Sequence, residues 1–153
     1  KEAREKQYID LHSNNLAQQI VHTFLAENLL VGHLAKVRKE YKNRRDAMVG
    51  AIRRYCNHNL VFDLPDGGFY LWCNVRSPLA TAELLRQAAV AGVSFVPGEA
   101  FYASGTDKQQ IRLCFAAHDS DRLTEGIRRL GRVLASAAGS AASPPPAAGL
   151  PIV

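Results

Sequence analysis

The sequence predicts a small protein of the α/β class, in which a compact α+β unit follows a largely helical N-terminal part. Apolar residues recur every three to four positions along residues 14–56, which is typical of helices. The spacing changes to two along residues 69–75, and short strands and helices are then predicted to alternate up to residue 135. The chain has 153 residues, of which 47% are apolar and 22% charged, and this balance favours a folded globular unit over a disordered chain.

Two helices are predicted in the N-terminal part. The first covers residues 14–31, and we expect Gly32 to end it. The second covers residues 33–56, because apolar residues recur at helical spacing from Leu34 to Tyr55. At the rise of an α-helix it would be about 36 Å long. Its basic outer faces are more typical of a strut between modules than of a core element.

The α+β unit is predicted to contain two helices, over residues 81–91 and 120–135. Thr81 is a candidate N-cap for the first, and Gly92 is the expected stop. Short strands are predicted in four places, over residues 60–64, 69–75, 93–96 and 110–115.

Several classes of site are not expected from the sequence. The three cysteines and five histidines lack the paired spacing of a metal site or a disulfide framework, so no metal is predicted. The apolar stretches are short and broken by charges, which argues against a membrane-spanning helix. The charged N-terminus lacks the apolar run of a secretory leader, so we expect a cytoplasmic protein.

The net charge of +5 lies entirely in the first part of the chain. Residues 1–60 carry 11 basic against 6 acidic side chains. The excess of positive charge lies mostly in the run KVRKEYKNRR at 36–45. A basic run can contact nucleic acid phosphates. No aromatic residues interleave this one as a ladder, however, so we interpret it as the solvated face of the long helix.

Arg112 is the most informative single position. A guanidinium in the middle of a short strand, between Ile111 and Leu113, is costly to bury without an anion. One interpretation is a solvated strand face or an ion pair with an internal carboxylate. The other is a receptor for a ligand's carboxylate, because the planar fork of donors matches that group with two parallel hydrogen bonds.

Two glycine-containing dipeptides, Gly67-Gly68 and Pro97-Gly98, also have two interpretations. Each is a tight turn, or a place where the backbone approaches a ligand that a side chain would obstruct. The segment GEAFYASG at 98–105 has the small and aromatic residues of a loop that closes over a small ligand.

Taken in order, four motifs make the chain resemble a known family. They are HLAKVRKEYKNRRDAM, PDGGFYLW, GVSFVPGEAFY and IRLCFA, followed by an amphipathic helix. Residues 6–135 resemble the C-terminal part of a fold-type I aminotransferase that depends on pyridoxal 5′-phosphate (PLP), in the branch of 2-aminoadipate and kynurenine aminotransferases. The aminotransferase-like domain of MocR-type (GntR) transcription regulators is similar as well. The resemblance implies a small, mostly antiparallel sheet with helices on one face, preceded by a long connecting helix.

The resemblance also implies roles for single residues. Arg112 matches the family arginine that holds the substrate's α-carboxylate. Gly67, Gly68 and Phe69 match a glycine-rich turn that enters a small-domain strand, and Pro97, Gly98 and Phe101 match a loop at the substrate entrance. The family lysine that forms a Schiff base with PLP has no counterpart here, because Lys1 and Lys6 lack its sequence setting. No catalytic or cofactor-binding residue, and no covalently bound cofactor, is therefore expected in this chain.

A domain organisation follows from the same resemblance. Residues 1–32 would be a remnant of the large cofactor-binding domain, with residues 10–19 at a homodimer interface. Residues 33–57 would be the interdomain helix, and residues 58–136 the C-terminal small domain. Residues 137–153 hold four prolines and no charge, which predicts a disordered tail.

Three hypotheses about function remain at this stage. The first is an inactive C-terminal fragment of an aminotransferase, whose parent moves an amino group from an L-amino acid to a 2-oxo acid. The second is the effector-sensing domain of a MocR-type regulator, in which a separate upstream domain would bind DNA. The third is an unrelated α+β domain with no site.

Overall fold

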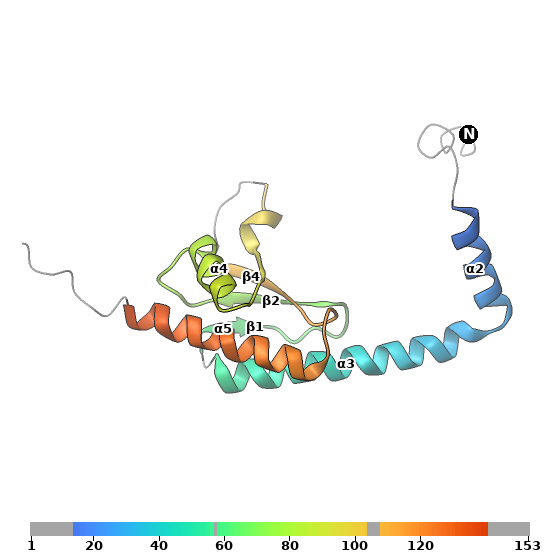
Figure 1. Ribbon diagram of the computed structural model, residues 1–153, viewed down its shortest axis with the longest axis horizontal. Helices are drawn as coiled ribbons and strands as arrows, with labels where there is room; N and C mark the ends of the chain where they lie inside the picture. The colour runs from blue at the N-terminus through green and yellow to red at the C-terminus, as the bar shows by residue number, and fades with distance from the viewer. Residues whose placement is uncertain (1–13, 57, 104–107, 141–153) are drawn as a thin grey trace, which may run out of the picture. The chain divides into compact units, whose positions relative to one another are not determined.

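The computed structural model describes residues 14–56, 58–103 and 108–140 (Figure 1). The chain divides into two compact units, with the boundary between Glu40 and Tyr41.

The N-terminal unit contains helix α2, Asn15–Ala26, and the first part of helix α3, Leu29–Tyr55. Asn14 caps α2, because its Oδ1 accepts a hydrogen bond from the backbone N–H of Ala17 at 3.0 Å. The prediction that Gly32 ends the first helix is wrong, since Gly32 lies inside α3. The helix ends earlier because Asn28 adopts a φ of +56°, a left-handed conformation that asparagine tolerates better than most residues.

The apolar side chains of this unit are largely uncovered within the part of the chain that the structure describes. None of the residues of α2 is buried. The exposed large apolar residues of α2 and of the start of α3 are Leu16, Ile20, Val21, Leu25, Leu29, Leu30, Val31 and Leu34. Most of the apolar stripe that predicted these helices is therefore exposed within the described residues.

The C-terminal unit is built on a four-stranded sheet with the order β1-β2-β4-β3 (Figure 1). Its strands are β1 Leu60–Phe62, β2 Tyr70–Val75, β3 Val96–Pro97 and β4 Gln110–Cys114. All three neighbouring pairs are antiparallel. This confirms the expected fold class, an α+β unit with a small antiparallel sheet.

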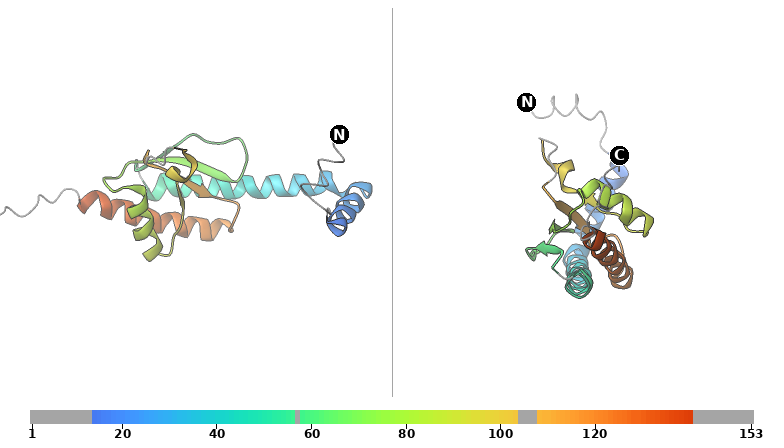
Figure 2. Two further views of the ribbon diagram at one scale, coloured as in Figure 1. Left: turned by 90° about the horizontal axis from the view of Figure 1, so that it is seen from above. Right: turned by 90° about the vertical axis from the view of Figure 1, so that its left-hand side faces the viewer.

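Helices cover one face of this sheet (Figure 2). They are the C-terminal half of α3, α4 at Thr81–Val90 and α5 at Ser120–Ser140. Alternate residues of the central strands, such as Leu71 of β2 and Ile111 of β4, point into this core and are fully buried. The stripe predicted for the last helix is buried with them, at Leu123, Ile127, Leu130 and Leu134.

The second half of α3 is a core element, which corrects the expectation of a strut. Met48, Val49, Ala51 and Ile52 are buried in the core beneath the sheet. Helix α5 lies directly against the end of α3, where Gly131 is so close to Tyr55 that a Cβ at Gly131 would overlap the Tyr55 carbonyl oxygen. The absence of a side chain at Gly131 lets the two helices approach this closely.

Two arginines of the basic run are bound to the small sheet unit rather than solvated. Arg44 Nη1 donates to the carbonyl of Ala116 at 2.8 Å, and Arg45 Nη1 donates to the carbonyl of Pro65 at 2.8 Å. The interpretation of residues 36–45 as a solvated face is therefore wrong at these two positions. Each guanidinium supplies a donor to a loop carbonyl that lies outside the strands.

The N-terminal end of α4 differs from the prediction, and its C-terminal end agrees with it. Ala80, not Thr81, is the N-cap residue, and Thr81 is fully buried in the first turn. Gly92 does stop the helix, with a φ of +75° and its N–H bonded to the carbonyl of Ala89 at 2.9 Å. The N–H of Val93 bonds back to Ala88 at 2.9 Å, so the predicted strand 93–96 is reduced to Val96 and Pro97.

The last helix is longer than predicted. Helix α5 continues to Ser140, and Ala137 within the expected tail is buried. The rest of that tail, residues 141–153, lies outside the described residues, as does segment 1–13. Among the helices that the structure describes, none is long and apolar enough to span a membrane. The described part of the chain also holds no cluster of three or more metal-ligating side chains.

Candidate functional site

The face of the sheet opposite the helices carries a row of aromatic and polar side chains. Because side chains alternate along a strand, Tyr70, Trp72 and Asn74 of β2 lie on this face. The register places Trp72 opposite Arg112 of β4, and Asn74 opposite Gln110. On this face Tyr70 and Asn74 are exposed and Trp72 is half-buried.

Arg112 lies between two aromatic rings. Its Cζ is 4.1 Å from the ring centroid of Tyr70 and 4.6 Å from that of Phe101. Both distances are within the range of a cation–π interaction. Two aromatic rings of the described chain therefore lie against the guanidinium.

The guanidinium of Arg112 lacks an anion within the described residues. Its Nε is buried and has no hydrogen-bond partner there. No carboxylate of the described chain forms an ion pair with it either. The internal ion pair, which was part of the first interpretation made from the sequence, is therefore absent from the described residues. A buried charged donor without an acceptor favours a site that an external anion completes.

Phe101 reaches Arg112 from the turn η1, Gly98–Phe101, which follows β3. Its ring also meets the ring of Trp72 edge to face, with centroids 5.4 Å apart. Phe101 remains 47% exposed. It can therefore contact a ligand while it covers the guanidinium.

The two predicted glycine positions differ in what they do. Gly98 is buried, and a Cβ there would lie 2.8 Å from Cβ and 2.9 Å from the carbonyl oxygen of Gln110. Its lack of a side chain serves the packing of η1 on β4. Gly68 has a φ of +86° and turns the chain into β2, while neither Gly67 nor Gly68 has a neighbour within 4 Å of a Cβ position.

Phe69 is connected to Arg112 through the ring of Tyr70. Its centroid is 5.3 Å from that of Tyr41 on α3 and 6.3 Å from that of Tyr70. The structure thus brings Phe101 and Arg112 into contact, and connects Phe69 to them only through Tyr70. Pro97 lies in β3, paired with Ile111.

Sequence reasoning did not single out Tyr70, Trp72, Tyr102 and Gln110. Alternation shows which residues of a strand share a face, but the pairing of β2 with β4 is needed to bring Trp72 beside Arg112. An aromatic residue at each second position of 70–72 was the available signal.

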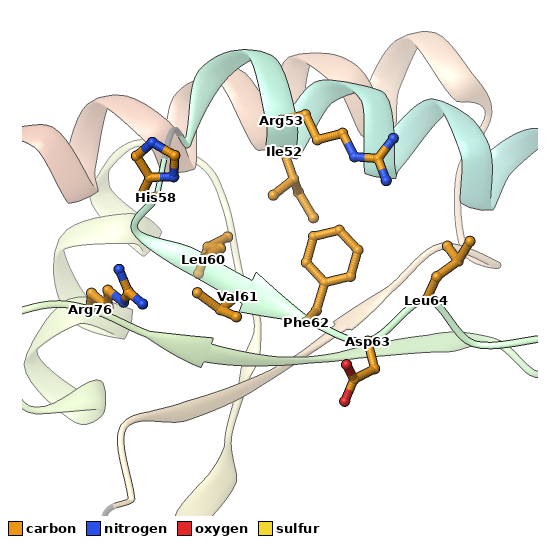
Figure 3. A pocket seen from close by; sticks show the side chains of 9 residues that line it. All are labelled: Ile52, Arg53, His58, Leu60, Val61, Phe62, Asp63, Leu64 and Arg76. Atoms are coloured by element: carbon orange, nitrogen blue, oxygen red, sulfur yellow. The ribbon is translucent and has the colours of Figure 1, made fainter.

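A hollow lies away from Arg112, at the β1 edge on the helix-covered side of the sheet (Figure 3). It has a volume of about 380 Å³, and its basic lining residues are Arg53, His58 and Arg76. Ile52 and Phe62 point toward each other between α3 and β1, whereas the carboxylate of Asp63 points away. The hollow contains none of the residues that surround Arg112.

The residues around Arg112 fit a carboxylate better than they fit PLP. Its direct ring contacts, Tyr70 and Phe101, carry no amine that could bind the cofactor covalently and no acid that could pair with its ring nitrogen. Two carboxyl groups with shifted pKa values lie on the helices instead, where Arg86 lowers the pKa of Glu83 to about 2 and Arg128 lowers that of Glu125 to about 2.

Comparison with known proteins gives a consistent result. Residues 5–130 match the sequence profile of a family described as aminotransferase class I and II. The chain is 36% identical over 129 residues to the 2-aminoadipate transaminase of Thermus thermophilus, covering 84% of this chain and 32% of that protein. It is 29% identical to the uncharacterized HTH-type transcriptional regulator YisV of Bacillus subtilis, covering 80% of this chain and 25% of the regulator.

A solved structure agrees with these matches. The fold superposes with a TM-score of 0.82 and 34% identity on LysN, an α-aminoadipate aminotransferase from Thermus thermophilus. That structure was solved in complex with N-(5′-phosphopyridoxyl)-L-leucine. The match covers 90% of this chain and 35% of LysN. The chain thus spans about a quarter to a third of the length of these relatives.

Proposed function

Because the chain belongs to the class I and II aminotransferase family, we propose that it is the part of a PLP-dependent aminotransferase that binds the α-carboxylate of the substrate. Arg112 is the proposed carboxylate receptor. The substrates would be an L-amino acid and a 2-oxo acid, which share that group. The family match and the length of the relatives support this proposal.

One observation carries the proposal, the unpaired guanidinium of Arg112. The buried Nε–H has no acceptor within the described residues, and the adjacent Nη–H is a second donor of the same planar group. A carboxylate can accept both at once, in the bidentate geometry that makes arginine–carboxylate hydrogen bonds strong. Lysine has a single ammonium and cannot reproduce this geometry.

The rings beside Arg112 would orient the substrate. The centroids of Tyr70 and Phe101 lie 4.1 Å and 4.6 Å from the Arg112 Cζ, so a carboxylate bound to the guanidinium would lie beside both rings. Trp72 and the exposed side of Phe101 then offer apolar surface to the rest of the substrate. Covering that surface excludes water and strengthens the charged hydrogen bonds.

PLP would be held by other parts of the longer protein. It supplies an electron sink for the bonds at the substrate's Cα when it is bound. This chain's residues would bind the carboxylate and fix the orientation of Cα, and none of them is proposed as catalytic. We therefore propose that the chain alone does not catalyse amino transfer.

The domain organisation remains part of the proposal. Residues 58–136 would be the small domain, residues 33–57 the helix that connects it, and residues 1–32 part of a large domain. The exposed apolar residues of α2 are consistent with burial in a larger assembly, such as a homodimer. Of the proposed interface segment 10–19, residues 10–13 lie outside the described residues.

A second candidate function is favoured by the match to the regulator YisV. In that case the same carboxylate site would sense an amino acid, and a separate domain would bind DNA. A carboxylate site is common to both candidates. The sequence that precedes this segment in the longer protein distinguishes them, because a DNA-binding domain there supports the regulator.

The carboxylate site can be tested on the purified chain by NMR. We expect the Nε–H signal of Arg112 to move on titration with L-leucine or 4-methyl-2-oxopentanoate. It should not move with isopentylamine, which has the same carbon skeleton without the carboxylate. Arg112→Lys removes this signal and identifies it.

The same substitution tests the role quantitatively. Arg112→Lys should weaken binding of the carboxylate about tenfold or more, because hydrogen bonds to charged groups contribute about 1.5–3 kcal/mol each. In the full-length protein it should raise KM and lower kcat/KM. Unchanged binding in a variant that retains the wild-type circular dichroism spectrum contradicts the proposal.

A further inference from the structure

We propose that Gln110 is a positioning residue, which fastens the turn η1 to the sheet and so places the ring of Phe101 on the guanidinium of Arg112. This inference rests on the proposed carboxylate site. It adds a residue that acts through Phe101 and touches neither the substrate nor the cofactor.

Both ends of η1 meet Gln110. At its start, Gly98 lies against Gln110 so closely that a Cβ at Gly98 would be 2.8 Å from the Gln110 Cβ. Just past its end, the hydroxyl of Tyr102 donates a hydrogen bond to Gln110 Oε1. The three residues between these contacts include Phe101. The position of its ring therefore depends on contacts made two residues along β4 from Arg112.

The amide of Gln110 is itself held from the other side. Its Nε2 donates to Oδ1 of Asn74 on β2 at 2.9 Å. The amide thus accepts from η1 and donates to the neighbouring strand, so both ends of the group are engaged. Asn74 and Gln110 are also directly paired in the sheet. The fastening consequently joins η1 to two strands.

The consequence reaches Arg112 through Phe101. The Phe101 centroid is 4.6 Å from the Arg112 Cζ and 5.4 Å from the centroid of Trp72. Phe101 is 47% exposed and has few other constraints of its own. If η1 detached from β4, one flat face of the guanidinium would be open to water. The charged hydrogen bonds to a carboxylate would then be weaker.

Trp72 reports this arrangement directly, because it is the single tryptophan of the chain. Its emission in the ligand-free protein depends on the ring of Phe101 beside it. The test therefore compares Trp72 emission, quenching by acrylamide, and the Arg112 Nε–H shift with L-leucine. All three are measured on the whole 153-residue chain.

Two variants remove the fastening with little change in volume. Gln110→Leu keeps the Cβ contact with Gly98 but loses both amide hydrogen bonds, and Tyr102→Phe loses only the hydroxyl. We expect each to increase quenching of Trp72 and to weaken leucine binding about three- to tenfold. Gln87→Leu is the matched control, since Gln87 also forms a side-chain hydrogen bond, to Glu83 on the surface of α4. It should change neither quantity.

A double-substitution cycle separates positioning from a general loss of stability. Phe101→Leu removes the ring through which Gln110 is proposed to act. Gln110→Leu should therefore have no further effect on leucine binding in the Phe101→Leu background. Independent, additive effects overturn the proposal. Wild-type quenching and wild-type affinity in both Gln110→Leu and Tyr102→Phe overturn it as well.

The outcomes also distinguish this inference from the proposed function. If the Arg112 signal of the wild-type chain does not move with leucine, the carboxylate site itself fails. The quenching of Trp72 in the ligand-free variants still decides if Gln110 fastens η1. If the wild-type Arg112 signal moves with leucine, and the variants match the wild type in leucine affinity and in Trp72 quenching, only the role of Gln110 fails.

Discussion

The guanidinium of Arg112 lies over the ring of Tyr70, with Cζ 4.1 Å from the ring centroid. The two residues belong to neighbouring antiparallel strands, and Tyr70 is two positions along β2 from Trp72, the residue paired with Arg112. Tyr70 is 42% exposed, so its ring covers the arginine without being buried itself.

Replacing this ring should loosen Arg112. Tyr70→Leu removes a cation–π contact worth about 0.5–2 kcal/mol, whereas Tyr70→Phe keeps the ring. We expect the Arg112 Nε–H signal to broaden and exchange faster with water in the leucine variant only. Equal behaviour of the two variants contradicts a role for the ring.

Two glycines of α5 should respond oppositely to alanine. At Gly131 a Cβ would overlap the Tyr55 carbonyl oxygen and lie 2.8 Å from its carbon, so Gly131→Ala forces α5 away from α3. Such overpacking costs about 1–3 kcal/mol of unfolding free energy. At Gly126 nothing lies within 4 Å of that position, and alanine should add about 0.5–1 kcal/mol through its helix propensity. Urea unfolding of both variants measures the difference, and a stable Gly131→Ala variant contradicts the close approach.

Stability should fall in acid through two surface carboxylates. The pKa of Glu83 and that of Glu125 are lowered from 4.5 to about 2, first by hydrogen bonds from Arg86 and Arg128. Groups with a lowered folded-state pKa stabilise the protein above their unfolded pKa. That stabilisation is present above pH 4.5 and is lost as the pH falls toward 2.

The measurement is the melting temperature between pH 6 and pH 2, at low salt to limit screening of the exposed pairs. Glu83→Gln and Glu125→Gln should each make the acid decline shallower. Glu27→Gln, which changes an exposed carboxyl at the end of α2, is the control. A decline that is the same in all four proteins excludes these ion pairs as its source.

The three cysteines should differ in reactivity. Burial raises the pKa of Cys56 and that of Cys73 to about 12, so the reactive thiolate is nearly absent at neutral pH. Cys114 is only half-buried. We expect one thiol to react with Ellman's reagent in the native protein and the other two only after unfolding. Cys114→Ser should abolish the fast reaction, and a native protein with three equally reactive thiols contradicts this burial.

Elements with local signals were predicted well from the sequence. The alternation of β2 matches its burial, and the apolar stripe of α5 is buried as expected. The break at Asn28 was missed because glycine at position 32 is the stronger stop signal, yet asparagine at 28 takes the left-handed conformation. The predicted strand 93–96 was too long because Val93 closes α4 through its bond to Ala88.

Arg112 was singled out from the sequence, whereas the aromatic side chains that lie against it were not. Arg112 could be found from the cost of burying a guanidinium, which depends on its immediate neighbours alone. Tyr70 and Trp72 required the pairing of β2 with β4, which strand patterns do not specify. Gln110 gave no signal, because its role depends on a hydroxyl brought back by η1.

Pro97 has a consequence for how the sheet ends. It lies in β3, an outer strand of the sheet, and is paired on its inner side with Ile111. Proline has no N–H to offer to a further strand, so this border cannot be extended as a regular ladder. Pro97 therefore protects the β3 edge of the sheet, which lies next to Arg112, against edge-to-edge aggregation. Self-association through strand pairing would have to use the opposite border, at β1.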